Sequence, residues 1–412
     1  MRVIIIGGGL AGVTTAYYLA IAGETVTVVE KASGVALETS FANAGLICPG
    51  HSYTWASPQA PITLIKSLFT DGQALRLKPT LDPAMYAWCW EFLKNCTNAK
   101  AHLFTSRKAR LSKYSQRKLQ ELRQKEGLNF EGRSKGLLYL HRSQKALDLA
   151  TVNMKVMTDN GLDLQALPMS KVVEVEPALK HLRDELAGGL YCPTDETGDA
   201  HLFTRALYAR CVGLGVDFRF NTEVTGFETS GRDVASVSTT AGRLLADRFV
   251  IAAGTLSPRL AKFLGYKVPI YPVKGYSVTF PIDDSHFWPQ VGGLDEHNLI
   301  AWAKFKDRLR FTGTAEFCGH DKSHRPEDFN HIIKAARQLF PDGADFSKPS
   351  YWAGLRPMTP SGTPILGRRR HTNLFFNTGH GHLGWTWSCG TATLVTDEML
   401  GRKPELDFED FS

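Results

Sequence analysis

The stretch VIIIGGGLAG, residues 3–12, decides the fold. Its four consecutive apolar residues are typical of a parallel strand that is buried on both faces, and its glycines match the pattern GxGxxG. In this pattern Gly7 allows a tight turn, Gly9 lets a pyrophosphate approach the backbone, and Gly12 lets a helix pack closely on the strand. We therefore expect a unit that holds a dinucleotide, because the amides and the dipole at a helix N-terminus favour a diphosphate.

The residues after these glycines complete a βαβ unit. The expected helix ends at Gly23, and a second strand, Val26 to Val29, is followed by Glu30, eighteen residues after Gly12. A carboxylate at this place accepts hydrogen bonds from the adenosine ribose hydroxyls and repels a 2′-phosphate, which disfavours NADP. The unit by itself does not distinguish FAD from NAD.

Two later segments favour FAD. The stretch LETSFANAGL, residues 37–46, consists mainly of small and hydroxyl residues and can run beside a large planar ligand. A buried strand, Arg248 to Ala252, leads into Ala253 and Gly254. Such small residues allow the backbone to approach a ligand at the carboxyl edge of a parallel sheet.

A third segment near the C-terminus also favours FAD. A strand from Asn373 to Asn377 leads into a glycine-rich turn and a long helix from Trp385 to Leu400. The amides at the start of this helix would stabilise negative charge at the N1 and C2 carbonyl end of a reduced flavin. His380 and His382 flank the turn, and each is either a protonated imidazole that stabilises this anion or a neutral capping group.

Length and composition exclude several classes of protein. A chain of 412 residues with 43% hydrophobic and 22% charged residues is expected to form two packed domains, and it is neither disordered nor fibrous. We find no apolar run long enough to cross a bilayer and no secretory signal, so a cytoplasmic protein is expected. The seven cysteines are scattered and form no CxxC pair. We interpret them as reduced thiols, with no zinc or other metal site.

The charge is concentrated in one segment. Between Lys100 and Lys125 there are nine Lys or Arg residues and one acid, Glu121, on a pattern of helical spacing. The simple interpretation is a solvated helix face. The alternative is peripheral contact with anionic lipid, to which each basic residue would contribute about 1 kcal/mol. Nucleic acid is not expected as a partner, because no recognised reading module accompanies the charge.

The remaining pattern predicts two interleaved domains. A helical region is expected from Pro58 to Gly161, with a strand at Gly136 to His141, and a meander is expected from Gly215 to Gly254. A second strand-rich block runs from Val268 to Phe317. The predicted fold is α/β: a Rossmann-like FAD-binding domain with an interleaved α+β substrate domain whose mixed sheet covers the flavin. The predicted division assigns 1–50, 195–265 and 355–412 to the FAD-binding domain, and 51–194 and 266–354 to the substrate domain.

Six segments in this order resemble the D-amino acid dehydrogenase small subunit, in the group that includes D-amino acid oxidase, glycine oxidase and sarcosine oxidase. The segments are GGG at 7–9, where related chains often carry GSG, LETSFANAG at 37–45, DETGD at 195–199, VKGYS at 273–277, GLRPMTP at 354–360 and NTGHG at 377–381. The resemblance implies an FAD-dependent dehydrogenase that passes electrons from a D-amino acid to a quinone or another membrane acceptor. Bacterial members of the group are peripheral proteins of the inner membrane, and this chain is therefore expected at the inner face of that membrane.

The resemblance also implies a mechanism and a carboxylate-binding residue. Hydride passes from the substrate α-carbon to flavin N5, and the imino acid that forms is hydrolysed to a 2-oxo acid and ammonia. Arg356 matches the arginine that binds the substrate carboxylate in this group, and it follows a turn-like Gly354. A planar guanidinium can hold a carboxylate by two parallel hydrogen bonds. The alternative is a structural ion pair.

Three further residues are candidates for the substrate pocket. Tyr276 lies in the matching roof strand and would either donate a hydrogen bond to the carboxylate or shape the pocket. Tyr53 and His51 lie on the loop after the flavin-edge stretch and would close the pocket. Lys274 could serve the flavin or a nearby carboxylate, but the favoured interpretation is an ordinary solvated lysine.

The cofactor is predicted to be non-covalent FAD, because no cysteine has a spacing that indicates a flavin link. The predicted cofactor-binding residues are Gly7, Gly9, Leu10, Ala11, Gly12, Glu30, Lys31, Thr39, Ser40, Asn43, Ala44, Gly45, Leu46, Val224, Ala253, Gly254, Gly354, His380, Gly381, His382, Leu383 and Gly384.

Two other functions remain open at this point. One is an oxidase that transfers electrons to O₂ and acts on glycine, sarcosine or D-proline. The other is a subunit that binds FAD and passes electrons within a membrane complex without oxidising a substrate itself.

Overall fold

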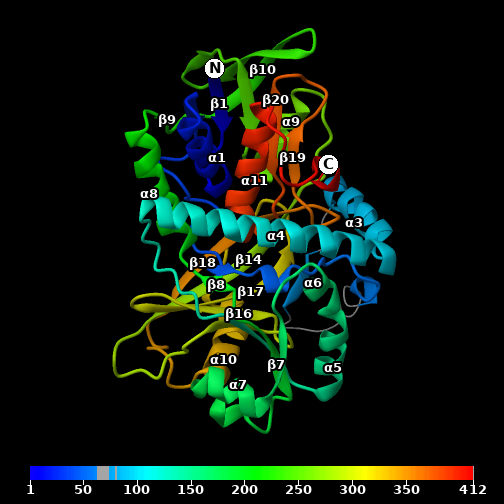
Figure 1. Ribbon diagram of the computed structural model, residues 1–412, viewed down its shortest axis with the longest axis vertical. Helices are drawn as coiled ribbons and strands as arrows, with labels where there is room; N and C mark the ends of the chain where they lie inside the picture. Colours follow the sequence, from blue (N-terminus) through cyan, green and yellow to red (C-terminus); the bar gives the residue numbers. More distant parts are fainter. Residues whose placement is uncertain (63–73, 79–80, 412) are drawn as a thin grey trace.

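The N-terminal βαβ unit forms as predicted. The computed structural model describes residues 1–62, 74–78 and 81–411 (Figure 1). Strand β1 (Arg2–Ile6), helix α1 (Leu10–Ile21) and strand β2 (Thr25–Val29) follow one another directly. A Cβ atom added at Gly12 would lie 1.9 Å from the carbonyl oxygen of Gly7, so only glycine allows this contact between helix and turn.

A six-stranded sheet surrounds β1 in the order β19-β20-β13-β1-β2-β9. All neighbouring strands are parallel except β19, which is antiparallel to β20. The other strands are β9 (Asp217–Arg219), β13 (Arg248–Ile251), β19 (Ile365–Arg368) and β20 (Leu374–Thr378).

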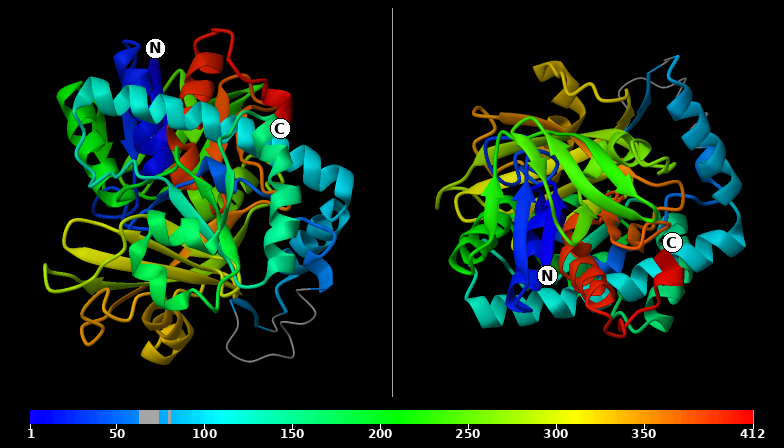
Figure 2. Two further views of the ribbon diagram at one scale, coloured as in Figure 1. Left: turned by 60° about the horizontal axis from the view of Figure 1, so that its bottom comes forward. Right: turned by 90° about the horizontal axis from the view of Figure 1, so that it is seen from above.

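Both faces of this sheet are buried, as the apolar run of β1 predicts. Val3 and Ile5 pack in a core with α1, α8 (Ala200–Gly213) and α11 (Gly384–Met399). Ile4 and Ile6 pack on the other face against an antiparallel three-stranded sheet. This sheet consists of β10 (Val224–Ser230), β11 (Asp233–Thr239) and β12 (Gly242–Leu244) and lies toward the viewer in the right view of Figure 2.

The predicted meander from Gly215 to Gly254 is therefore wrong as a single sheet. Its first and last strands, β9 and β13, pair in parallel with β2 and β1, and its middle forms the separate three-stranded sheet. The reason is that β13 is apolar on both faces and is buried at the centre, whereas β10 ends in exposed polar residues.

A nine-stranded mixed sheet forms the lower part of the molecule in Figure 1, which confirms the predicted mixed sheet. Its order is β18-β14-β17-β16-β15-β5-β7-β6, with β4 beside β17. Helices α7 (Met169–Val175) and α10 (Asn330–Leu339) pack on the sheet in a second core. The strands are β4 (Leu75–Leu77), β5 (Leu137–His141), β6 (Gln165–Pro168), β7 (Gly188–Cys192), β14 (Tyr271–Pro281), β15 (Gly292–Asp295), β16 (Ile300–Lys304), β17 (Arg308–Phe317) and β18 (Ser350–Met358).

The long basic helix is present as α4 (Asn98–Glu126), which runs across the middle of the molecule in Figure 1. Thr97 caps its start through Lys100 N, and Gly127 ends it in the left-handed conformation. The remaining elements are α3 (Pro83–Asn95), α5 (Gln144–Asn153), α6 (Lys155–Asp159), α9 (Ser257–Lys262), β3 (Leu46–Ile47), β8 (Glu196–Thr197) and the 3₁₀ helices η1 (Pro49–His51), η2 (Pro177–Leu182), η3 (Gly254–Leu256), η4 (Pro326–Phe329) and η5 (Phe408–Phe411).

Within the described ranges, no helix combines the length and the apolar composition needed to span a bilayer. The seven cysteines are all free thiols. The boundaries of the two predicted domains stay a prediction.

Candidate cofactor and substrate site

A cavity of about 740 Å³ lies between the six-stranded and the nine-stranded sheets. Its walls come from the glycine turn after β1, the ends of β2 and β13, the loop 38–46, the strands β14, β17 and β18, and the start of α11. Three predicted site residues, Gly12, Gly45 and Tyr53, do not line it. The predicted residues that do line it are Gly7, Gly9, Leu10, Ala11, Glu30, Lys31, Thr39, Ser40, Asn43, Ala44, Leu46, His51, Val224, Ala253, Gly254, Tyr276, Gly354, Arg356, His380, Gly381, His382, Leu383 and Gly384.

The turn after β1 has the shape that a dinucleotide requires. A Cβ atom added at Gly9 would have only Ser40 Oγ near it, at 4.0 Å, so the space in front of this backbone is open for a pyrophosphate. Glu30 accepts hydrogen bonds from Gly8 N at 2.6 Å and from Ala32 N at 2.8 Å. A carboxylate has further lone pairs, and these remain for ribose hydroxyls. The residues present therefore fit the adenosine end of FAD.

The loop beside the expected flavin is fastened to the roof of the cavity. Thr39 Oγ1 donates to Leu355 O at 2.6 Å, and Arg310 Nη1 donates to Asn43 O at 3.1 Å. These two bonds connect the first half of the loop to β18 and its second half to β17. The loop is therefore held between the two sheets.

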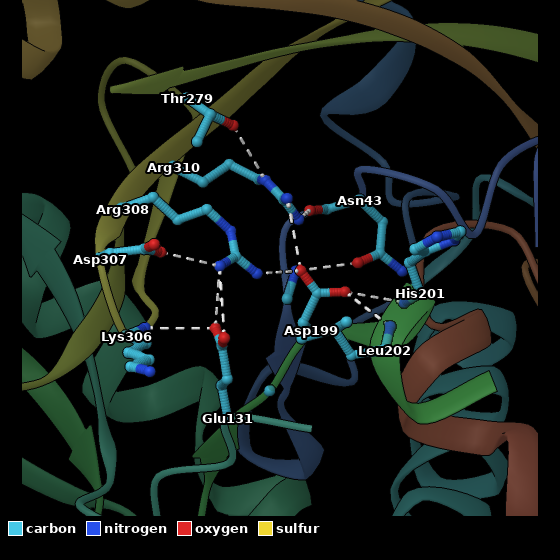
Figure 3. A network of polar contacts seen from close by, with 12 residues as sticks. Asn43, Glu131, Asp199, His201, Leu202, Thr279, Lys306, Asp307, Arg308 and Arg310 are labelled. Atoms are coloured by element: carbon cyan, nitrogen blue, oxygen red, sulfur yellow. Dashed lines mark hydrogen bonds and ion pairs between the residues drawn. The ribbon is translucent and has the colours of Figure 1, made fainter. Parts of the chain in front are cut away.

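Arg310 is itself held by a buried network, which Figure 3 shows. Asp199 lies 3.5 Å from Arg310 and 2.8 Å from Arg308, and it also accepts hydrogen bonds from the first amides of α8. Burial alone would raise the pKa of Asp199, but the two guanidinium groups and the amides hold the pKa below its usual value. The network therefore connects the loop, the roof and the start of helix α8 through one set of charges.

Burial lowers the pKa of both histidines before α11. His380 Nε2 lies 3.0 Å from Asn377 Oδ1 and 3.1 Å from Thr391 Oγ1, and burial lowers its pKa to about 4. The pKa of His382 lies well below its usual value because of burial and the nearby basic groups, Lys108 first among them. The lowered pKa values favour a neutral capping group over a protonated imidazole at this place. The amides at the start of α11 remain as the source of positive potential.

Arg356 lies in the roof of the cavity without a counter-ion. Its Nη1 donates to Thr314 O at 2.8 Å, and it forms no ion pair with any residue that the structure describes. Burial lowers its pKa to about 10. Within the described ranges, the structure therefore offers no ion pair as an alternative role for Arg356. The predicted turn-like setting of Gly354 is wrong, because Gly354 lies within the continuous strand β18 and pairs with Gly275 of β14.

The three other catalytic candidates occupy different places. Tyr276 lines the cavity, but its hydroxyl donates to Glu316 Oε2, which favours a role in shaping the pocket over a hydrogen bond to substrate. His51 lines the cavity, and its Nε2 lies 2.7 Å from Glu296 Oε1. The ring of Tyr53 packs against that of His51, with centroids 5.6 Å apart, and Tyr53 does not line the cavity itself.

Lys274 is not a solvated lysine, contrary to the prediction. It is completely buried, donates to Ser323 O at 2.9 Å and lies 3.7 Å from Glu316 Oε1. The ammonium group therefore helps to hold the carboxylate that receives the hydroxyl of Tyr276. The burial follows from the position of β14, which is covered on both faces, since residues 271–278 are all buried.

The loop that carries His51 is attached to α4. Ser112 Oγ lies 2.6 Å from Ser52 Oγ, Lys108 Nζ donates to Tyr53 O at 2.6 Å, and Thr105 Oγ1 accepts from Thr54 N at 3.2 Å. The three helix residues are buried and spaced by three and four positions, so they form one stripe on α4. Sequence reasoning missed this stripe because Lys108 counts as one more positive charge in a basic segment.

Lys108 gives the protein a predicted pH dependence of stability. Burial lowers the pKa of Lys108 from 10.5 to about 7, and it has no carboxylate partner in the described ranges. Between these values the unfolded chain binds more protons than the folded one, so the free energy of unfolding rises with pH in this window. Each pKa unit corresponds to about 1.4 kcal/mol.

Replacing Lys108 by Met should remove this pH-dependent contribution. We expect the unfolding free energy of wild type to rise by a few kcal/mol between pH about 7 and about 10, relative to that of Lys108→Met, which lacks the titrating group. Urea unfolding across this range measures it, with Lys113→Met, at an exposed position of the same helix, as the control. Parallel curves for wild type and Lys108→Met would contradict the assignment.

Several cavity residues were missed by sequence reasoning. Trp55 stacks on His382 with ring centroids 5.1 Å apart, and Trp352 lies across Gly354 in the roof. Ser277 and Thr314 also line the cavity. No motif indicates these residues. The alternation of β14 could have identified Ser277, because it lies two residues from Gly275.

The comparisons with known proteins agree with this site. A sequence profile described as FAD dependent oxidoreductase matches residues 2–398. D-amino acid dehydrogenase from Methylobacterium radiotolerans is 44% identical over 413 aligned residues, which cover 100% of this chain and 99% of that protein. D-amino acid dehydrogenase from Bradyrhizobium diazoefficiens is 43% identical over 407 residues, which cover 99% of this chain and 97% of that protein.

A solved structure supports the fold. Glycine oxidase from Geobacillus kaustophilus superposes with a TM-score of 0.76 at 24% identity, covering 100% of this chain and 98% of that one. The family profile extends over almost all of this chain, and the relatives match it from end to end, which confirms the resemblance seen in the six segments. The chain therefore belongs to the family of FAD-dependent oxidoreductases.

Proposed function

We propose that this protein is an FAD-dependent dehydrogenase that converts D-amino acids to 2-oxo acids and ammonia. The observation that carries the proposal is Arg356, a buried guanidinium without a counter-ion in the roof of the cofactor cavity. Such a group is stabilised by a carboxylate that arrives with a ligand. The names of the two relatives, which are more than 40% identical over their whole lengths, support a D-amino acid as that ligand.

The residues of the cavity would mainly bind and orient the substrate. When bound, non-covalent FAD supplies the two-electron acceptor. Arg356 holds the substrate carboxylate, and His51 and Trp55 line the same cavity. The substrate loses a hydride from its α-carbon and a proton from its amine, and water converts the resulting imino acid to the 2-oxo acid. Orientation of this kind contributes to the rate by fixing the geometry of the reacting atoms.

Anaerobic reduction of the protein by amino acids tests the proposal. We expect the yellow colour of the holoprotein to bleach with D-amino acids and to persist with the matching L-enantiomers. Bleaching by this chain alone would also exclude a subunit that only passes electrons. Bleaching by L-amino acids alone would contradict the proposed substrate class.

We propose a quinone or another membrane acceptor for the electrons, in place of O₂. The support is the name dehydrogenase, which both curated relatives carry, whereas glycine oxidase is similar only at the level of fold. Parallel assays of peroxide release and of quinone reduction test this choice. Peroxide formed at the rate of substrate consumption would favour the oxidase alternative.

We propose that the protein contacts the cytoplasmic face of a membrane peripherally and that helix α3 is the contacting surface. Tyr86, Trp90 and Leu93 are 56%, 62% and 42% exposed and are spaced by four and three residues, so they share one side of the helix. Lys94 lies beside Trp90, with its Nζ 5.4 Å from the ring centroid, and it forms an exposed ion pair with Glu91 at 2.8 Å, so the case for α3 rests on its apolar side chains. Aromatic and apolar side chains next to a basic residue suit the interface of an anionic bilayer.

The basic helix α4 is a weaker choice for this contact. Lys108 is buried, and Arg117, Lys118 and Arg123 form ion pairs with glutamates of this chain. Four of the nine basic residues between Lys100 and Lys125 are therefore buried or paired within the protein, so less of the predicted positive potential remains for lipid.

Vesicle binding tests the assignment to α3. We expect Trp90→Ser and Leu93→Ser each to reduce binding to vesicles of anionic phospholipid by about tenfold, because each removes an apolar side chain from the interface. Val152→Ser, at an exposed position of α5, is the control. Equal binding by the three variants would contradict the proposed surface.

A further inference from the structure

His51 and Glu296 form a hydrogen-bonded pair at the wall of the cavity. His51 ends η1 and lines the cavity, and its Nε2 lies 2.7 Å from Oε1 of Glu296, the residue that follows β15. Both side chains are partly exposed. The imidazole stacks on Tyr139 with ring centroids 5.0 Å apart, and the preceding Gly50 N donates to Asp195 Oδ1 at 3.0 Å. The ring is therefore held in one place at the edge of the cavity.

The carboxylate of Glu296 determines which nitrogen of His51 can accept a proton. Burial alone would raise the pKa of Glu296, but His51 and the charge of His141 hold it below its usual value, which favours the ionised carboxylate. An ionised carboxylate only accepts hydrogen bonds, so His51 Nε2 is the donor in this contact. In the neutral imidazole Nδ1 then has the free lone pair. Nδ1 forms no hydrogen bond with any described residue, and it is not enclosed in the way that His382 Nε2 is, so it remains accessible.

The pair lies close to the expected carboxylate site. Burial and then the charges of Lys108, His51 and Arg356 lower the pKa of His382. His51 and Arg356 are therefore near the same ring, and all three residues line the cavity. The amine and the carboxylate of an α-amino acid are attached to one carbon atom. A substrate whose carboxylate binds Arg356 thus brings its ammonium group into the part of the cavity that His51 borders.

We propose that His51 is a catalytic residue, whose Nδ1 accepts a proton from the substrate ammonium group directly or through one water molecule, and that Glu296 is its positioning residue. The proposal deepens the proposed function and rests on it. One N–H bond of the ammonium group breaks, its electron pair stays on nitrogen as the amine lone pair, and the imidazole becomes an imidazolium beside the carboxylate. The α-carbon then gives its hydride to the flavin, the lone pair forms the C=N bond, and the imidazolium returns the proton to solvent.

Other titratable groups face the imidazole as well. They are His141 and Tyr139 of β5, Asp195 before β8, Tyr53 of the same loop and His382 before α11. Burial raises the pKa of the two tyrosines and of Asp195 and lowers the pKa of the two histidines, which favours the neutral form of each. Glu296 is therefore the facing group best suited to stabilise an imidazolium at His51.

The pH dependence of flavin reduction tests the proposal. We expect His51→Gln to slow anaerobic reduction of the holoprotein by a D-amino acid about 10²-fold at neutral pH, because glutamine can still bind Glu296 but is not a base. The acid limb of its rate profile should move to higher pH, since only substrate that is already deprotonated then reacts. Glu296→Gln should slow reduction less and move the limb to lower pH, because the imidazolium loses its carboxylate partner. His297→Gln, at an exposed position next to Glu296, is the control.

Carboxylate binding separates this role from a structural one. Propanoate has the carboxylate of the substrate but no amine, and its binding can be followed through the flavin absorption spectrum. We expect His51→Gln to bind propanoate as wild type does. Equal losses of propanoate affinity and of reduction rate would mean that His51 shapes the carboxylate site, and they would overturn the proposal, as would a wild-type rate and pH profile in His51→Gln. If no D-amino acid reduces the wild-type holoprotein, the proposed function itself fails.

Discussion

Replacing Arg356 by Ala should reduce kcat/KM for D-amino acids by about 10²- to 10⁴-fold. Two charge-assisted hydrogen bonds to a carboxylate contribute about 1.5 to 3 kcal/mol each, and about 1.4 kcal/mol corresponds to a tenfold change. Steady-state kinetics with a dye acceptor measures the loss. Because the glycine turn and the roof strand β18 belong to different walls of the cavity, the variant should keep its FAD.

Two further measurements make this prediction specific. Arg356→Lys should lie between Ala and wild type, because an ammonium group cannot form two parallel hydrogen bonds. Thermal stability without substrate should not fall in Arg356→Ala, because a buried charge without a counter-ion is removed. Arg337→Ala, on the exposed side of α10, is the control for loss of an arginine. A wild-type KM in Arg356→Ala would show that the carboxylate binds elsewhere.

The parts of the fold that are encoded locally could be predicted from the sequence. The apolar run before Gly7, the glycines and Glu30 all lie within the first thirty residues, and together they form the expected βαβ unit. The helix after the turn at residues 378–384 was also predicted to within a residue. In both cases the signal is a periodicity or a backbone requirement that neighbouring residues satisfy.

The errors come from contacts between distant segments. The partners of β9 and β13 lie in β2 and β1, so composition alone suggested a meander that the pairing does not form. Lys274 was expected in solvent because lysine usually lies there, but Glu316, on another strand, holds it in the interior. The stripe on α4 is equally non-local, since its partners Ser52 to Thr54 lie about fifty residues earlier.

The role of glycine in the roof leads to the second large effect. A Cβ atom at Gly275 would lie 2.5 Å from Cζ and Nη2 of Arg356 and 2.6 Å from Nη1, so the guanidinium covers this glycine directly. In Gly275→Ala the flexible end of Arg356 has to move, while the strand pairing of β14 and β18 can remain. We expect kcat/KM to fall by about 10²-fold or more, since a displacement of about 1 Å at a binding group has an effect of this size.

A double-mutant cycle tests whether the effect acts through Arg356. If the methyl group of Gly275→Ala acts only by displacing the guanidinium, adding this substitution to Arg356→Ala should cause little further loss, and the two effects should be strongly non-additive. Gly226→Ala, where an added Cβ meets nothing within 4 Å, controls for the loss of a glycine in a strand. Additive effects would mean that Gly275 serves the cofactor or the fold directly. Non-additive effects would mean that the missing side chain at Gly275 serves to place the guanidinium of Arg356.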